Sequence, residues 1–554
     1  MKAKWKQLNF TDILLLLSLI LVGSFHEYIA YGLTVVMAAR LLAVIHKNKK
    51  ITLYKNSLGL AVGVICLFSL VGCLWAVDRG MALIGFLKLL PALLYLLCLW
   101  QEEKEGCATE LLPYVGAAMA VISAVAMQIP ALKSWFSVAD RLAGFFQYPN
   151  TFALFLLVCE LLLLRKEQRK LWDYGVILVL LAGILYTGSR TVFVVAALAN
   201  VVMLFAVSKK RGRVVLVLLG AAACVVVAVL GFSGNPVIGR FLRFSLTEST
   251  LVGRVLYVVD ALPLILKHPF GMGYMGYYYT QQSVQTGVYS VAYIHNDFLQ
   301  LILDIGWIPG LVVLFWLGRF FLKKQVDLGQ KIIVGAVCLH SLFDFNMQFT
   351  GMLLLLVLLT DVRGDKTIHM KKVLPCQIGA AATALVSLYL CVALAAGHWG
   401  ANQLSDAMYP FNTRNKLTML EQEADLSKAD RLADEILKTN TAYYAPYTVK
   451  AAYAYSQGDF GALIRYQRQA FERNPFEYEP YETYCQMLLV GLSRYREAGD
   501  TNSAQICRQE LLKVSKQLES NRYRLSKLGA MIADQPVTEL PAEIREVIAQ
   551  LGGS

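Results

Sequence analysis

Charged residues are scarce in this sequence of 554 residues: Asp, Glu, Lys and Arg together make up only 16% of it. A typical soluble protein has about 25%. Familiar chemical motifs are missing as well, because the chain has no CxxC pair, no Cys/His cluster with metal-ligand spacing, no P-loop, no HExxH and no GxSxG. These absences argue against soluble nucleotide hydrolases, zinc proteases and serine hydrolases, and we expect neither a metal site nor a cofactor.

Hydrophobic residues are abundant instead, at 57% of the chain. Before residue 398 they gather in about thirteen apolar runs, most of them close to the ~20 residues that span a membrane. The runs predict an all-α protein, a polytopic membrane helical bundle of about 12–13 spans over residues 1–397. They lie near 10–24, 27–46, 57–76, 81–100, 109–128, 149–164, 172–187, 191–208, 213–232, 296–318, 331–347, 350–361 and 374–397.

The net charge of +13 suggests nucleic-acid binding until it is divided along the chain. Residues 398–554 hold 18 basic and 20 acidic residues, which leaves 34 basic and 19 acidic residues for the first 397. This surplus falls in alternate connections between the apolar runs, which the positive-inside rule places in the cytoplasm. We therefore expect no nucleic-acid partner. We expect a multi-pass protein of the bacterial cytoplasmic membrane with a cytoplasmic N-terminus and an extracytoplasmic C-terminal region. The basic connections lie near 47–55, 165–170, 209–213, 319–331 and 363–372.

Residues 398–554 have a different character, with balanced charge and a period of 34 residues. Asn440 recurs as Asn474, and Pro446 recurs as Pro480. The spacing resembles that of the tetratricopeptide repeat, a helix–turn–helix unit. It predicts a second, extracytoplasmic α-helical repeat domain over 398–554, with an irregular third unit. Such a domain either binds a protein partner or a glycan on its concave surface or serves as a stacked cap without a ligand.

Two of the outward-facing connections are long, one near 129–148 and a larger outer loop at about 233–295. Long loops of this kind are usually functional. Apolar residues at helical spacing over 252–267 predict an interfacial helix within the second. Arginine binds phosphate oxygens through a planar fork, and histidine accepts protons near neutral pH. Four such residues on this face suit a pyrophosphate headgroup beside a hydroxyl nucleophile: Arg141, Arg190, Arg254 and His295. Snorkelling arginines and a structural histidine are the simpler alternative.

Ionisable residues also occur within the apolar runs, where such residues are usually functional. Lys88 lies in the fourth run. His340 and Asp344 are four residues apart, so we expect them to share a helix face and pair; Asp304 could pair with a neighbouring arginine. The glycine-rich stretch 271–276 follows no strand, so we exclude a dinucleotide site and expect a tight turn or a close backbone approach beside a substrate.

Several short pieces, taken in order, resemble the O-antigen ligase and O-antigen polymerase superfamily over roughly residues 10–362. No single piece is decisive, but their order and the large outer loop before His295 make the resemblance specific. The pieces are RLAG at 141–144, PN at 149–150, TGSRT at 187–191, GR at 253–254, HPFGMG at 268–273, HNDFLQ at 295–300, GWIPG at 306–310 and HSLFD at 340–344.

This resemblance implies a metal-independent membrane glycosyltransferase that takes a glycan from an undecaprenyl-pyrophosphate carrier. The glycan passes to a hydroxyl of a glycan, lipid or protein acceptor at the outer face of the lipid bilayer. On this basis His295 is the candidate base or acceptor-positioning group, and His295 and Arg254 are the candidate catalytic residues. Arg190, Arg254 and Arg141 are the candidate pyrophosphate ligands. Asp297 and Trp307 depart from the family pattern, and ligase and polymerase chemistry both stay open.

A lipid-linked glycan flippase or transporter is the main alternative function. Many spans with internal charges would suit it, but transporters usually show internal repeats in their membrane part. No such repeat is found here, and the candidate cations gather on one face instead of at midplane.

Overall fold

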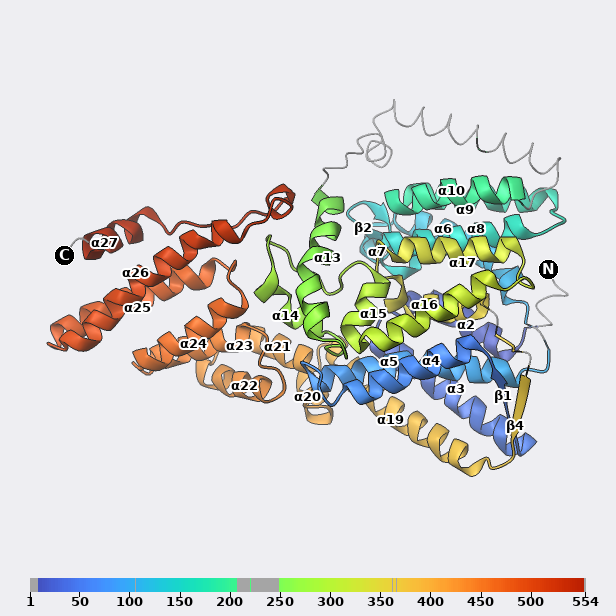
Figure 1. The fold of residues 1–554 in the computed structure, drawn as a ribbon, viewed down its shortest axis with the longest axis horizontal. Coiled ribbons are helices and arrows are strands. Elements are labelled where there is room, and N and C mark those ends of the chain that lie inside the picture. Colours follow the sequence, from blue (N-terminus) through green and yellow to red (C-terminus); the bar gives the residue numbers. More distant parts are fainter. Residues whose placement is uncertain are drawn as a thin grey trace. The chain divides into compact units, whose positions relative to one another are not determined.

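The computed structural model describes residues 8–104, 106–206, 220, 249–360, 362–364 and 366–552. Regular structure in these ranges is almost entirely helical, which confirms the all-α prediction (Figure 1). The predicted run at 213–232, the basic connection at 209–213 and residues 233–248 of the outer loop lie outside the described residues.

Contacts divide the chain into two compact units. The first takes the described residues within 1–71, 84–245 and 295–395, and the second takes those within 72–83, 246–294 and 396–554. The second unit therefore joins the described part of the outer loop to the C-terminal repeats. The predicted domain boundary at residue 398 falls on the last residue of helix α19, and the two-domain division itself stays a prediction.

Within the described residues, five helices are long and apolar enough to cross a membrane by length and composition, which confirms a polytopic membrane protein. Seven shorter helices are also apolar. The long ones are α3 (Glu27–Asn48), α5 (Arg79–Gln101), α6 (Ala108–Ala126), α13 (Ser249–Lys267) and α19 (Leu374–His398). The shorter ones are α2 (Phe10–Ile20), α4 (Ser57–Gly72), α9 (Leu171–Tyr186), α10 (Arg190–Ala206), α16 (Trp307–Leu322), α17 (Leu328–Ser341) and α18 (Thr350–Leu359).

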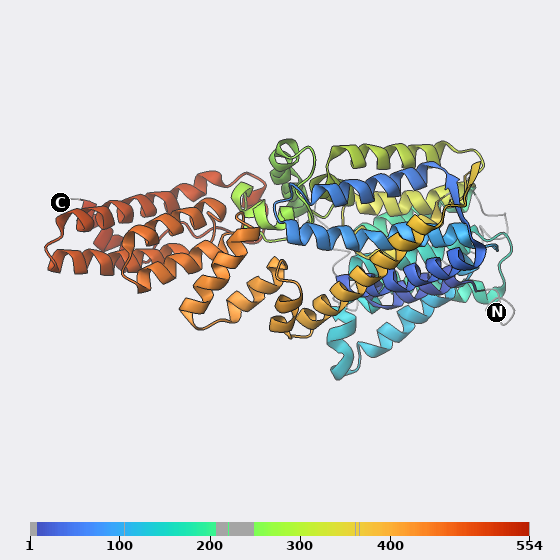
Figure 2. The ribbon, with the colours of Figure 1, turned by 90° about the horizontal axis from the view of Figure 1, so that it is seen from below.

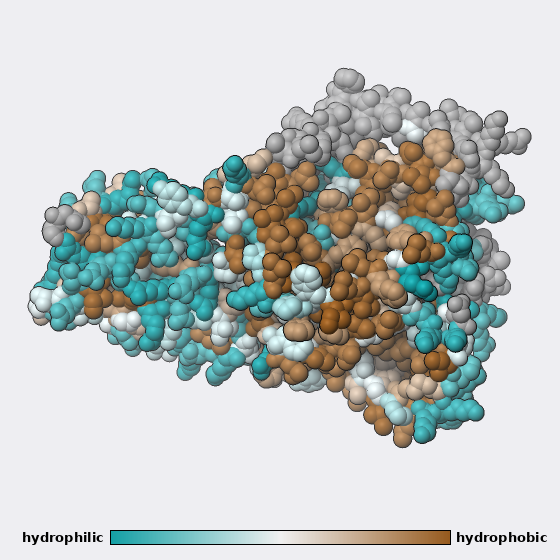
Figure 3. All heavy atoms as spheres, in the orientation of Figure 1, coloured by the Kyte–Doolittle hydropathy of each residue, from teal (hydrophilic) through white to brown (hydrophobic). Residues whose placement is uncertain are grey.

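Large apolar side chains cover the outer surfaces of the helices of the first unit (Figure 3). Leu311 on α16 is 62% exposed and Leu385 on α19 is 69% exposed. Extended apolar surfaces of this kind are rare on soluble proteins and are typical of a lipid-facing surface.

Helix α8 (Pro149–Arg165) forms the centre of the first unit. Every residue from Pro149 to Leu164 is buried, because α6, α9, α10 and α17 pack around it. A helix enclosed in this way needs apolar residues on all sides and no amphipathic stripe, as its FALFLLV stretch provides. Its first turn presents Asn150 and Thr151 to a cluster of polar side chains around His295.

The predicted run at 296–318 is wrong as one continuous span. It forms two helices, α15 (Asp297–Ile305) and α16, which meet at Gly306. Gly306 has a φ of 93°, a conformation that L residues other than glycine rarely adopt. The break makes α15 a short helix whose N-cap directly follows His295.

Four of the five predicted basic connections lie almost entirely within the described residues, and they contact one another in two pairs. Strand β1 (Ile51–Lys55) pairs antiparallel with β4 (Lys366–Met370), which joins two of these connections. Arg165 pairs with Asp327, which joins two more of these connections. Connections predicted to share a membrane face thus contact one another.

Helices of the C-terminal region follow the 34-residue period. Helices α22 (Leu426–Thr439) and α24 (Phe460–Arg473) start 34 residues apart, as do α23 (Ala445–Ser456) and α25 (Glu479–Glu497). Asp425 and Asp459 cap the two equivalent helix starts. Figures 1 and 2 show the long α25 beside α26 (Thr501–Arg524). The remaining elements are α20 (Asn402–Met408), α21 (Thr413–Gln422), the 3₁₀ turn η4 (Gly529–Met531) and α27 (Ala542–Gly552). The tetratricopeptide assignment stays a prediction.

The repeats are hydrogen-bonded to residues 72–83 of the same unit. The Asn440 amide Nδ2 donates to Asp78 Oδ2 at 3.1 Å, and the Tyr409 hydroxyl donates to the Gly80 carbonyl at 2.9 Å. Asp78 also caps α5 by accepting from the Met81 N–H. Burial raises the pKa of Asp78 despite these hydrogen bonds.

Candidate functional site

Three of the four site residues predicted from the sequence belong to the first unit. His295 directly precedes Asn296, the N-cap of α15. Arg190 is the first residue of α10, and Arg141 lies in the short strand β3 (Arg141–Leu142), which pairs with β2 (Ser137–Val138). Arg254 lies in the second turn of α13, which belongs to the second unit. The structure thus brings the first three to one unit, and Arg254 is described within the other.

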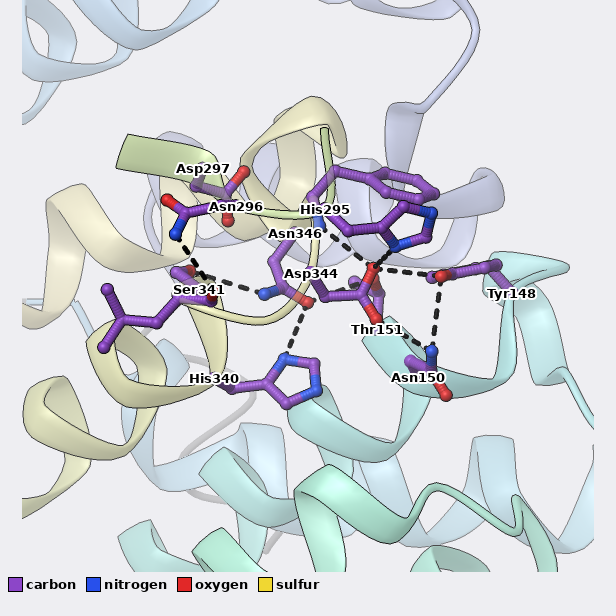
Figure 4. A network of polar contacts seen from close by, with 12 residues as sticks. Tyr148, Asn150, Thr151, His295, Asn296, Asp297, His340, Ser341, Asp344 and Asn346 are labelled. Atoms are coloured by element: carbon purple, nitrogen blue, oxygen red, sulfur yellow. Dashed lines mark hydrogen bonds and ion pairs between the residues drawn. The ribbon is translucent and has the colours of Figure 1, made fainter. Parts of the chain in front are cut away.

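His295 lies beside a buried carboxylate. Its Nδ1 atom is 3.3 Å from Oδ1 of Asp344, whose side chain is fully buried, whereas the histidine side chain remains 19% exposed (Figure 4). The backbone of His295 has a φ of 55°. Left-handed conformations at residues other than glycine cost roughly 1–3 kcal/mol and gather at functional sites. The arrangement holds one edge of the imidazole against a negative charge.

Asp344 accepts hydrogen bonds from several donors on other residues and from the backbone. The Tyr148 hydroxyl donates to Oδ1 at 2.9 Å, and the Phe345 N–H donates to the same oxygen at 3.0 Å. The Asn150 amide donates to Oδ2 at 2.7 Å. Donors of this number favour the ionised form of a buried carboxylate. Asp344 can therefore orient the His295 ring and stabilise positive charge on it.

Arg141 holds the Asn150 side chain that donates to Asp344. Its Nη2 donates to Asn150 Oδ1 at 2.6 Å, and its Nε donates to the carbonyl of Thr187 at 2.8 Å. Guanidinium groups only donate, so Arg141 fixes the Asn150 oxygen toward itself and turns the Asn150 NH₂ group toward Asp344. Thr187 also belongs to the turn that precedes Arg190, and Gly188 in that turn has a φ of 62°. A single chain of contacts thus links the turn before α10 to His295.

The expectation that His340 and Asp344 share a helix face is wrong. Helix α17 ends at Ser341, so Asp344 lies in the following turn. His340 belongs to a neighbouring buried cluster, where its Nδ1 and the Thr151 hydroxyl each lie 3.1 Å from Asn346 Oδ1. Asn346 also donates to Ser341. This second cluster fixes the turn that carries Asp344.

The start of α15 is attached to the same turn. Asn296 caps α15 by accepting from the Leu299 N–H and donates its amide to the Leu342 carbonyl at 3.0 Å. Asp297 accepts from the Met347 N–H at 3.0 Å, next to the 3₁₀ turn η3 (Asn346–Gln348). These bonds attach the two residues that follow His295 to the turn that carries Asp344.

Aromatic rings line the histidine side of the site. The Phe345 ring meets the His295 ring edge-on at a centroid distance of 4.9 Å, and it packs on Tyr148 and Phe349. Further along this wall, Phe349 packs on Phe25. Apolar walls exclude water and strengthen the electrostatic interactions inside a site.

Lys88 lies at the far end of this wall, with its Nζ 5.0 Å from the centroid of the Phe25 ring. Only 6% of Lys88 is exposed. Its charge interacts with that of the Asp304 carboxylate, for which the sequence suggested an arginine partner.

The glycine-rich stretch at 271–276 forms a turn in the second unit. Gly271 and Gly273 have φ values of 85° and 82°. The Met272 carbonyl accepts from the Val77 N–H at 2.9 Å, and a Cβ on Gly273 would lie 2.5 Å from the Cβ of Ala76. These glycines serve a tight turn and a close approach, as predicted.

Sequence reasoning missed the roles of Tyr148, Asn150 and Asp344. Asn150 stands in the Pro149-Asn150 piece of the family resemblance, and Asp344 ends its HSLFD piece, so both carried a signal. Their contacts could not be read from the sequence, because they join residues far apart in it, such as Tyr148 and Asp344, which are 196 positions apart. Tyr148 carried no separate signal in the sequence.

The fold and site together define a polytopic helical membrane protein with a buried carboxylate–histidine pair. Residues 175–315 match the family described as O-Antigen ligase. This match supports the resemblance to the O-antigen ligase and polymerase superfamily that the motifs implied. Arg190, Arg254 and His295 lie within the matched range, whereas Arg141 and Asp344 lie outside it. No curated protein and no solved structure matches the chain. The family supports a glycosyltransferase-like role in polysaccharide assembly.

Proposed function

We propose that this protein transfers a glycan from an undecaprenyl-pyrophosphate carrier to an acceptor hydroxyl at the outer face of the bacterial cytoplasmic membrane. The observation that carries the proposal is the His295–Asp344 pair, with 3.3 Å between Nδ1 and Oδ1. A carboxylate at Nδ1 keeps the proton on that nitrogen and leaves Nε2 to accept another. His295 then acts as the general base that takes the proton of the acceptor hydroxyl.

The bond changes follow from this assignment. The acceptor oxygen attacks C1 of the glycan as His295 removes its proton, and the bond from C1 to the pyrophosphate breaks with inversion. Negative charge grows on the departing pyrophosphate, and fixed cations lower the barrier most when they face that charge. Arg190 and Arg254 are the proposed ligands of this group. Arg190 starts α10, so its guanidinium shares the anion-favouring end of a helix.

Arg141 takes a different role from the one expected at first. Its Nε and Nη2 atoms donate to the Thr187 carbonyl and to Asn150. We therefore assign it as a positioning residue for Asp344 instead of a primary pyrophosphate ligand.

The proposed topology rests on the paired contacts between the basic connections. These connections would face the cytoplasm, and His295 would face outward. Reporter fusions after residue 55 and at the C-terminus test this arrangement. A cytoplasmic C-terminus would contradict it.

The central test incubates membranes that contain the protein with undecaprenyl-pyrophosphate glycan and an acceptor. We expect release of undecaprenyl pyrophosphate together with glycan transfer, with no loss of turnover in EDTA. Removing a general base typically lowers kcat by about 10²–10⁴-fold, so His295→Ala should fall in this range, and Arg254→Ala should lower kcat and kcat/KM for the donor.

Matched controls are available on the same chain. His398→Ala removes an exposed histidine at the end of α19, and Lys267→Ala removes an exposed cation from the helix that carries Arg254. Both should keep wild-type turnover. Wild-type turnover in His295→Ala and Arg254→Ala would contradict the site. Movement of the intact lipid-linked glycan without transfer would identify a flippase instead.

A further inference from the structure

The C-terminal end of the chain returns to the outer loop and packs against the helix that carries Arg254. Residues 525–533, which we term the docking segment, follow α26 and include η4. Figure 1 shows this red segment beside α13. The docking segment, α13 and the loop residues 276–294 all belong to the second unit.

The docking segment packs on one face of α13. Ile532 forms a buried cluster with Val252 and Leu256, and Leu528 and Tyr289 pack against it. The Ala533 N–H donates to the hydroxyl of Ser249, the first residue of α13, at 2.8 Å. Val252 and Leu256 are four residues apart and therefore share a helix face. Arg254 is two residues from each, so it lies on the opposite face.

The same face of α13 continues to Asp260, four residues beyond Leu256. Asp260 is only 3% exposed. Its carboxylate accepts from the Thr286 N–H at 2.9 Å, from the Thr286 hydroxyl at 2.7 Å and from the Tyr289 hydroxyl at 3.0 Å. These bonds attach α13 to the part of the outer loop that runs on to His295 nine residues after Thr286.

Thr286 also binds the docking segment. Its carbonyl accepts from the Ser526 N–H at 2.9 Å, and its hydroxyl lies 2.9 Å from the Ser526 hydroxyl. Two glycines permit this approach: a Cβ on Gly529 would lie 2.0 Å from the Thr286 carbonyl oxygen, and a Cβ on Gly287 would lie 2.8 Å from Cα of Gly529. Thr286 thus joins the helix of Arg254, the loop that leads to His295 and the C-terminal segment at one point.

We propose that Asp260, Thr286 and the docking segment are positioning elements that hold Arg254 and the loop before His295 in their working geometry. The inference rests on the proposed function, because it assigns Arg254 to the pyrophosphate. It also gives the C-terminal region a defined role, since the repeats deliver the docking segment to the back of α13. Small misplacements of such groups reduce catalysis strongly, by up to about 100-fold for 1 Å.

The test uses full-length protein in membranes and the variant Gly529→Ala, whose added methyl group would meet the Thr286 carbonyl. Gly461→Ala is the matched control, since a Cβ there meets only Asp459 Oδ1 at 3.4 Å. Docking is followed without any substrate through a disulfide between Thr286→Cys and Ser526→Cys, detected by loss of maleimide labelling. We expect Gly529→Ala to abolish this cross-link and to lower kcat/KM for the donor by roughly 10–100-fold. Gly461→Ala should change neither.

A second pair of variants separates positioning from general stability. Thr286→Val removes the hydroxyl that Asp260 accepts from, while Thr286→Ser keeps it. We expect the valine variant to raise the KM for the donor and the serine variant to restore the wild-type value, at similar unfolding temperatures.

The outcomes distinguish the two proposals. If Gly529→Ala keeps the cross-link, or loses it without changing kcat and KM, the positioning inference is overturned. If the wild-type protein releases no undecaprenyl pyrophosphate, the proposed function fails and the catalytic part of the inference fails with it. The cross-link then still reports whether the docking segment is bound to the loop.

Discussion

Asp344→Asn is the most informative single substitution in this site, because Tyr148, Asn150 and the Phe345 N–H all donate to this side chain. Arg141 fixes the Asn150 oxygen toward itself, so the Asn150 NH₂ group must face Asp344 Oδ2. On the other oxygen, the Phe345 N–H cannot reverse its direction. An asparagine at 344 keeps the shape of the aspartate but must turn its own NH₂ group toward one of these donors.

The substitution should have two separate effects, one on folding stability and one on catalysis. A buried donor that loses its acceptor costs about 1–3 kcal/mol of folding free energy, and the substitution creates one such conflict whichever way the amide turns. The catalytic loss is larger, because the amide carries no charge to orient and stabilise the His295 ring. Replacing an orienting carboxylate by its amide lowers kcat about 10⁴-fold in serine proteases. We expect a fall in kcat of roughly 10²–10⁴-fold here.

The assay measures undecaprenyl pyrophosphate release per mole of protein in membranes, alongside the unfolding temperature in detergent. Thr360→Val is the matched control, because it removes a buried hydrogen bond to the Leu356 carbonyl at constant shape, at the end of α18 away from the site. It should lose a similar stability, about 1 kcal/mol, and keep its turnover. Wild-type kcat in Asp344→Asn, or equal losses of kcat in both variants, would refute the reasoning.

Further predictions concern the arginines, one carboxylate and two thiols. Arg190→Lys keeps the charge but loses the planar fork, so the KM for the donor should rise about tenfold, a change that competition with free pyrophosphate can check. Arg141→Lys cannot reach both of its acceptors at once, so kcat should fall while the donor KM stays the same; a raised KM would return Arg141 to the pyrophosphate. Burial raises the folded-state pKa of Asp78 above 3.8, so the folded protein keeps this proton to a higher pH than the unfolded chain does. The free energy of unfolding of the wild type therefore falls as the pH rises from that value. The stability of Asp78→Asn relative to wild type should therefore increase with pH over this window, as measured by denaturant unfolding; a constant difference would contradict it. Burial raises the pKa of Cys485 to about 12 and that of Cys507 to about 11, and both are free thiols, so native protein at neutral pH should resist maleimide at both and be insensitive to reductant.

Much of the fold was predictable because hydropathy and charge act locally. A run such as 374–397 must be helical in a bilayer, which leaves no other way to satisfy its backbone, and α19 spans Leu374–His398. The basic connections predicted to share a face do contact one another in pairs, through β1 and β4 and through Arg165 and Asp327. The sequence did not predict the break at Gly306. Glycine is common inside membrane helices, so a glycine in an apolar run does not by itself indicate a left-handed backbone conformation.

The site was predictable in part for the same reason. His295 carried a signal in its own neighbourhood, within a recognisable motif and at the end of a long loop. Helical periodicity could not identify Asp344 as the partner of His295. Helix α17 ends at Ser341, so Asp344 does not lie on a helix face. Spacing of four residues predicts a contact only while the helix continues. Because the helix ends before Asp344, the carboxylate of Asp344 can contact His295.

Arg141 shows why residue type alone does not settle a role. An arginine on the outward side of a membrane enzyme suits a phosphate, and Arg141, Arg190 and Arg254 share that property in the sequence. What separates them is the direction of hydrogen bonds: Arg141 donates to Asn150, and Asn150 in turn donates to Asp344. A guanidinium never accepts, so Arg141 fixes which end of the Asn150 amide faces it. The other end of that amide must then donate to Asp344, the carboxylate beside His295. A cation can thus control a catalytic base without touching the substrate, and the contrast between kcat and KM in Arg141→Lys and Arg190→Lys is the measurement that tells the two roles apart.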